Sequence, residues 1–230
     1  MRGALDRRRG SMSATDAEGL YDLYAQALSG FDGALIFGGA RMLMRDDPEK
    51  IVPSITEVPS RLRRFCPEMI VLGIVPKTED LRLDDRFGLV VSSESGNPYI
   101  TVIHPEQDIV LVVQTSADDK EIWDAEFQEC LRITSDLREY GDWKSVLVSY
   151  NGGPVTKREI IATAERGWPV VLIKGSGRVT DEFAADKDFL IVHRDNVAVA
   201  KQDPIDLRMK LSDFGAMPRQ RLTLVSNLSG

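Results

Sequence analysis

Residues 146–188 repeat one arrangement twice: an apolar run, a glycine turn and a helical pattern. The apolar runs are residues 146–148 and 169–173, and the helical patterns cover residues 156–166 and 179–185. Short apolar strands that alternate with helices are typical of a parallel sheet with helices on its faces. The sequence therefore predicts an α/β fold with a mainly parallel central sheet.

The two glycine turns carry the candidate site, because ligands of such sheets bind where strand ends meet helix starts. Backbone N–H groups at a helix start attract phosphate or carboxylate. In the second turn Ser176 adds a hydroxyl and Arg178 adds a planar, two-pronged donor that suits phosphate. The alternative is a plain strand-to-helix connector capped by Ser176, and Gly-x-Gly alone does not decide between the two. The turn residues are Asn151, Gly152 and Gly153, then Gly175, Ser176, Gly177 and Arg178.

Residues 151–184, NGGPVTKREIIATAERGWPVVLIKGSGRVTDEFA, resemble the end of the SLOG domain. This domain is found at the cytoplasmic amino terminus of TRPM channels and in stand-alone prokaryotic relatives. Its pattern is a strand, an Asn/Glu-Gly-Gly turn, a helix, Pro-Val-x-Val, Gly-Ser-Gly-Arg and a small-residue helix containing Asp. The matching residues are Asn151, Gly152, Gly153, Pro169, Val170, Gly175, Ser176, Gly177, Arg178 and Asp181. The resemblance implies a single Rossmann-like, three-layer α/β domain in which the turn residues and Asp181 bind a nucleotide.

An earlier glycine pair, Gly38 and Gly39, follows the predicted strand at residues 31–37 and resembles the first SLOG strand and turn. Relatives continue with Ser or Thr and another glycine before a helix, whereas this chain continues with Ala40 and Arg41. The hydroxyl is absent and Arg41 is the residue that would compensate for it. Gly38, Gly39, Ala40 and Arg41 join the candidate ligand-binding residues. We expect the strand ends at Phe37, Val75, Tyr150 and Ile173 to share one rim of the sheet.

The rest of the chain is predicted to complete one domain over residues 15–214, between a disordered tail (1–14) and a carboxyl-terminal tail (215–230). The strand at 69–75 resembles the second family strand, and the polar segment 78–97 is read as an excursion with a hairpin. Residues 189–192 are predicted to be the last core strand. The remaining predicted elements are helices at 15–29, 55–65, 122–140 and 203–214, and strands at 99–103, 109–114 and 197–199.

Composition limits the function. The net charge of −7 and pI near 5 argue against a sequence-independent nucleic-acid binder. Two separated cysteines and two histidines predict reduced thiols in a cytoplasmic protein without a zinc site, and we expect no metal or redox cofactor. No apolar run is long enough to span a bilayer.

The resemblance implies a cytoplasmic sensor for a nucleotide derived from NAD, such as ADP-ribose or a cyclised relative, of the kind associated with prokaryotic defence. A second hypothesis is an N-glycosidic hydrolase related to phosphoribohydrolases or NADases. Against it, Pro154 and Val155 interrupt the glycine loop of those enzymes, and Glu159 is the nearest acid. A third is a structural α/β subunit with a degenerate pocket. Relatives commonly self-associate, so we expect a homo-oligomer that uses an apolar patch around residues 42–44 or Trp123.

Overall fold

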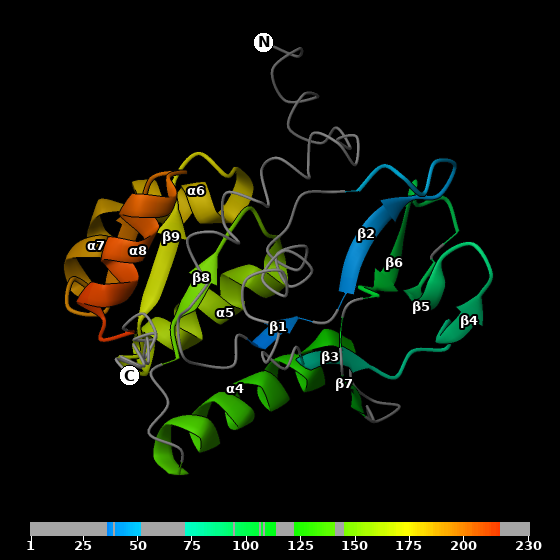
Figure 1. The fold of residues 1–230 in the computed structure, drawn as a ribbon, viewed down its shortest axis with the longest axis horizontal. Helices are drawn as coiled ribbons and strands as arrows, with labels where there is room; N and C mark the ends of the chain where they lie inside the picture. The colour runs from blue at the N-terminus through cyan, green and yellow to red at the C-terminus, as the bar shows by residue number, and fades with distance from the viewer. Residues whose placement is uncertain are drawn as a thin grey trace, which may run out of the picture.

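The computed structural model describes residues 36–38, 40–51, 72–93, 95–105, 107, 109–113, 122–140 and 145–216. The helices predicted at 15–29 and 55–65 lie outside these residues, as do the amino-terminal tail and most of the carboxyl-terminal one. The described chain is a mixed α/β structure with five helices and three sheets (Figure 1). Two sheets are parallel and one is antiparallel. One continuous, mainly parallel sheet, as predicted, is therefore present only in part.

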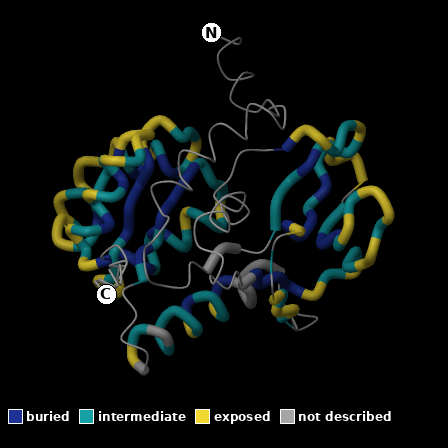
Figure 2. The backbone as a smooth tube through the Cα atoms, in the orientation of Figure 1, coloured by how far each residue is buried: buried dark blue, intermediate teal, exposed yellow. Residues whose placement is uncertain are grey.

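The best packed sheet contains β8 (Leu147–Ser149), β9 (Val170–Ile173) and β10 (Val197–Ala200), in the order β10-β9-β8. All three strands run parallel, with Leu147 beside Val170 and Val170 beside Val197. All four residues of β9 are buried, as expected for the central strand of a sheet that is covered on both faces. Figure 2 shows these strands as the dark, buried interior of their half of the molecule.

Helices cover both faces of this sheet. On one face α5 (Pro154–Glu165), α6 (Arg178–Ala185) and α7 (Lys187–Val192) pack against side chains that include Val170, Leu172 and Val197. On the other face α8 (Pro204–Asp213) places Leu207 and Leu211 against Val171, Ile173 and Ala200. The side chains separate in this way because successive residues of a strand point to opposite faces. The predicted three-layer arrangement is present around this sheet.

The second parallel sheet has the order β1-β3-β7, with β1 (Ile36–Gly38), β3 (Leu72–Pro76) and β7 (Ile109–Val113). The long helix α4 (Ile122–Tyr140) packs along this sheet, chiefly against β3 and β1. No described helix combines the length and the apolar character needed to cross a bilayer.

The antiparallel sheet has the order β2-β6-β5-β4. Its strands are β2 (Ala40–Met44), β4 (Arg82–Asp84), β5 (Gly88–Ser92) and β6 (Tyr99–Ile103). One face packs onto the second parallel sheet, where Val91 and Ile103 meet Val75. The predicted hairpin within residues 78–97 is confirmed as the β4–β5 pair.

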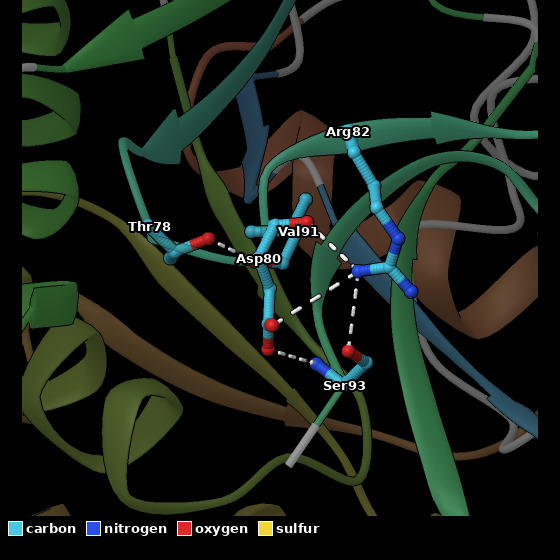
Figure 3. Close-up of polar contacts among 5 residues, drawn as sticks. All are labelled: Thr78, Asp80, Arg82, Val91 and Ser93. Carbon is cyan, nitrogen blue, oxygen red and sulfur yellow. Dashed lines mark hydrogen bonds and ion pairs between the residues drawn. The ribbon is translucent and has the colours of Figure 1, made fainter.

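Polar contacts hold the base of this hairpin (Figure 3). The Thr78 hydroxyl donates to the Val91 carbonyl, and the Ser93 N–H donates to Asp80 Oδ2 at 2.7 Å. Arg82 Nη1 donates to the Asp80 carbonyl at 3.1 Å and to Ser93 Oγ at 3.3 Å. These bonds join the segment before β4 to β5 and the residue after it, so the hairpin leaves the domain at a fixed point.

Two predicted elements are wrong. Residues 189–192 are not a strand but lie in α7, where the Asp186 carboxylate caps the helix by accepting from the Phe189 N–H at 3.0 Å. The predicted short strand at 197–199 takes the edge position in the sheet instead, as β10. The chain after Gly38 and Gly39 does not enter a helix, because residues 40–44 form β2 and pair with β6.

Candidate functional site

The first glycine turn joins β8 to α5 through two residues with positive φ. Asn151 has φ of 59° and Gly152 has φ of 83°. A side chain at Gly152 would also collide with its surroundings, since an added Cβ would lie 2.4 Å from Thr156 Oγ1. Pro154 begins α5, a position at which a proline loses no helical hydrogen bond. Glycine at 152 is thus required both by conformation and by space.

The second turn joins β9 to α6 and has a more extreme backbone. Gly175 has φ of 88°, and Gly177 has φ of 100° and ψ of 171°, a region that is essentially restricted to glycine. Arg178, the first residue of α6, also has a positive φ, of 49°. In the described residues, the N–H groups of Arg178 and Val179 have no protein acceptor. They are the open amino-terminal donors of α6.

The two turns are bonded to each other, because β8 and β9 are neighbours that end at the same rim. The Asn151 N–H donates to Ser176 Oγ at 2.9 Å, and the Thr180 N–H donates to the Asn151 carbonyl at 3.0 Å. The Thr180 hydroxyl donates to the same carbonyl at 2.9 Å and lies 2.6 Å from the Ser149 hydroxyl. Ser149 and Thr180 are buried, so this network fixes the start of α6 on β8.

Asp181 belongs to the second turn rather than facing away from it. Its Oδ1 accepts from the Gly175 N–H at 2.6 Å and its Oδ2 accepts from the Gly177 N–H at 3.0 Å. A carboxylate in the first turn of a helix also interacts favourably with the helix dipole. Two N–H groups that were candidates for a ligand anion are therefore already bonded within the protein.

Arg178 connects the second turn to the first. Its Nη2 lies 3.0 Å from the point that a Cβ on Gly153 would occupy, so the guanidinium lies over Gly153. The side chain is exposed, and the described residues contain no ion pair between Arg178 and Asp181 or Glu182. A guanidinium beside open backbone N–H groups makes a local positive site on an acidic protein.

The earlier glycine pair lies in different elements. Gly38 ends β1 and Gly39 is outside the described residues, while Ala40 and Arg41 begin β2. Phe37 and Val75 share one parallel sheet, and Tyr150 and Ile173 belong to the region of the other. A single rim for all four strand ends, and a single site that includes residues 38–41, remain predictions.

Glu159 and Tyr150 have shifted pKa values near the turns. Burial raises the pKa of Glu159, on α5, to about 7, and the charge of Arg158 opposes the rise. Burial also raises the pKa of Tyr150 to about 12, with a further contribution from the negative charge of Asp181. Glu159 is therefore a carboxyl group that exchanges its proton near neutral pH.

Sequence reasoning missed the roles of Ser149, Thr180 and Gln202. Gln202 Nε2 lies 2.9 Å from the point that a Cβ on Gly175 would occupy, so its amide covers that turn from the segment between β10 and α8. For Thr180 a signal was present, since a hydroxyl three residues after Gly177 faces the sheet when α6 begins at Arg178. Gln202 had no comparable local signal.

Comparison with known proteins agrees with this part of the fold. The family model described as "SLOG in TRPM, prokaryote" matches residues 88–213. A structural match is the X-ray structure of TM1055, with 21% identity and a TM-score of 0.38 over 67% of this chain and 69% of that one. No protein of curated function matches the chain. Since the family match covers more than half of the sequence and includes both bonded glycine turns, the chain belongs to the prokaryotic SLOG family related to TRPM channels.

Proposed function

We propose that this protein is a nucleotide-binding sensor whose ligand is derived from NAD, such as ADP-ribose or cyclic ADP-ribose. The observation that carries the proposal is the junction of the two glycine turns, where the Arg178 guanidinium lies over Gly153. The open N–H groups of Arg178 and Val179 lie at the start of the same helix. A phosphate is the ligand group that accepts hydrogen bonds from both kinds of donor.

The electrostatics of the junction favour an anion despite the net charge of −7. Asp181 is the acidic group within the second turn, and both of its oxygens accept bonds from backbone N–H groups. Arg178 brings a full positive charge, and a charge-assisted hydrogen bond is worth about 1.5–3 kcal/mol. The phosphate supplies affinity in this proposal, and the rest of the nucleotide supplies selectivity.

Calorimetric titration of ADP-ribose, cyclic ADP-ribose and NAD into the full chain tests the proposal. Arg178→Ala should weaken binding about tenfold or more, and Arg178→Lys should recover only part because lysine lacks the planar fork. Arg194→Ala is the matched control. Arg194 is an exposed arginine that follows α7 at the opposite end of the β9 and β10 strands, and its removal causes the same change in net charge.

The expected result is a wild-type affinity that falls with the loss of Arg178 and not with the loss of Arg194. Absence of binding by all three nucleotides would refute the NAD-derived ligand. Equal affinities of wild type and Arg178→Ala would refute the position of the phosphate.

A second candidate, an N-glycosidic hydrolase, is favoured by Glu159. A general acid or base works best when its pKa is close to the operating pH, and burial raises the pKa of Glu159 to about 7. Glu159 also lies on the helix that begins at the first glycine turn. Incubation with NAD, AMP and ADP-ribose would separate the candidates, because a sensor leaves them intact. A hydrolase would release the base, and Glu159→Gln would abolish that release while binding persists.

We also infer self-association, which the resemblance implies. Three side chains of β7 are exposed and apolar, Ile109, Leu111 and Val112. They form a better candidate surface than Met42 and Met44, which are partly buried in β2. Light scattering over a wide concentration range tests this, and a constant monomer mass would refute it.

A further inference from the structure

Asp181 makes an unusual pair of bonds, with each carboxylate oxygen taking a different N–H group of the same glycine turn. Oδ1 accepts from Gly175 at 2.6 Å and Oδ2 accepts from Gly177 at 3.0 Å. The neighbouring acid, Glu182, is exposed and makes no hydrogen bond or ion pair in the described residues. The two adjacent carboxylates therefore have the same charge and different contacts.

The bonds of Asp181 fix the backbone that directs Arg178. Gly177, one of the two donors, has φ of 100° and ψ of 171°, and the next residue has φ of 49°. Such conformations persist only where surrounding contacts determine them. The result of this backbone path is that the Arg178 guanidinium reaches back over Gly153 in the other turn.

We propose that Asp181 is a positioning residue: it holds the Gly175–Gly177 turn in the shape that places Arg178 over Gly153, and it does not itself contact the ligand. This inference rests on the proposed function, since it assigns Asp181 to the anion site at that junction. It also implies that the ligand anion uses Arg178 and the open helix N–H groups, because the N–H groups of Gly175 and Gly177 are occupied.

Two opposite effects decide the outcome of removing the carboxylate. Loss of a negative charge near the anion should strengthen binding up to about threefold, since exposed charges interact weakly through water. Loss of the turn geometry should remove most of the benefit of Arg178, which is about tenfold. Asp181→Asn should therefore weaken binding, whereas Glu182→Gln, which removes the same charge one residue away, should leave it unchanged or slightly stronger.

The test uses ADP-ribose as probe, calorimetry for affinity, and wild type, Asp181→Asn, Glu182→Gln, Arg178→Ala and the Asp181→Asn/Arg178→Ala double variant. A positioning residue acts through its partner, so Asp181→Asn should weaken binding three- to tenfold in the wild-type background and have no such effect in the Arg178→Ala background. Equal weakening in both backgrounds would overturn the proposal and assign Asp181 to direct ligand contact. Stronger binding by Asp181→Asn would also overturn it, because charge alone would then dominate.

Two further readouts keep the test independent of folding and of the ligand. Asp181→Glu keeps the charge but moves the carboxylate by one methylene, so it should also bind less tightly. Wild-type affinity in that variant would refute a geometric role. In the absence of ligand, amide exchange at Gly175 and Gly177 should accelerate in Asp181→Asn and not in Glu182→Gln. Unchanged exchange would overturn the proposal, whereas failure of wild type to bind ADP-ribose, with the exchange result as expected, would count against the ligand alone.

Discussion

The strands β7 and β9 are similar apolar runs with different surroundings. In β9, VVLI, every residue is buried, while in β7, IVLVV, Ile109, Leu111 and Val112 are 47%, 36% and 44% exposed. The difference lies in their neighbours, because β9 has a strand on each side and helices on both faces, whereas β7 is a terminal strand of its sheet. An apolar run thus predicts a strand, and the packing of other elements determines whether it is buried.

The glycine pairs differ in the same way. Gly152 and Gly153 lead from a parallel strand into a helix, with a second turn bonded beside them. Gly38 ends a parallel strand, and after Gly39 the chain turns into the antiparallel sheet. A helix start supplies open N–H groups, whereas a paired strand uses its own in the ladder. The carboxyl-terminal half therefore has the better candidate anion site.

The largest expected effect compares the two sheets directly. Leu172→Ala, in β9, should lower the free energy of unfolding by about 2–5 kcal/mol, because the side chain is fully buried and the surroundings cannot close the cavity. Leu111→Ala, in β7, should cost about 1 kcal/mol or less, since much of its side chain already contacts water. Urea unfolding of both variants measures the difference. Equal losses would mean that β7 is covered in solution, which would support an interface there.

Glycine 152 gives the next largest effect. Gly152→Ala adds a side chain at φ of 83° and within 2.4 Å of Thr156, so it should cost about 3 kcal/mol and weaken nucleotide binding strongly. Gly167→Ala is its control, because Gly167 has φ of 69° and open space around it. That variant should cost about 1 kcal/mol and leave binding unchanged. A Gly152→Ala protein with the stability and affinity of Gly167→Ala would show that the first turn is not tightly packed.

Local patterns predicted the carboxyl-terminal half well, and long-range pairing limited the rest. The helix at 122–140 is confirmed at both ends, and the strands at 146–148 and 169–173 are confirmed within a residue. Residues 189–192 were misread because a short apolar run fits a strand or a helix, although the Asp186 cap was a signal for the helix. The pairing of residues 40–44 with residues 99–103 has no local signal at all.

The same limit applies to the site. The positions of the glycines and of Arg178 could be read from the chain, because a tight turn and a phosphate-binding cation are properties of single residues. The destination of the Asp181 carboxylate could not, since either a ligand or the turn itself satisfies a carboxylate at a helix start. Its bonds depend on the fold of Gly175 and Gly177, which precede it by six and four residues.

Glu159 is expected to make stability depend on pH. The pKa of its carboxyl group is raised from 4.5 to about 7, so the folded state binds the proton more tightly than the unfolded state does. This contribution is fully present below pH 4.5 and is lost as pH rises to about 7. Glu159→Gln cannot ionise, so it should match wild type near pH 4 and exceed it by about 2–3 kcal/mol at pH 8. Parallel stability curves for the two proteins from pH 4 to 8 would refute the shifted pKa.

Thr180 gives the smallest expected effect and tests the bond between the two turns. Thr180→Val keeps the shape of the side chain and removes the hydroxyl that contacts Ser149 and the Asn151 carbonyl. Buried groups left without a partner cost about 1–2 kcal/mol, and a small loss of affinity should follow because α6 is less firmly fixed. Thr163→Val is the matched control, since Thr163 is a buried threonine on α5 without a side-chain hydrogen bond in the described residues. Thermal unfolding and calorimetry of both variants should show losses for Thr180→Val alone. Equal effects of the two substitutions would mean that burying a methyl group in place of a hydroxyl explains the result, and the turns would then be joined mainly by Ser176.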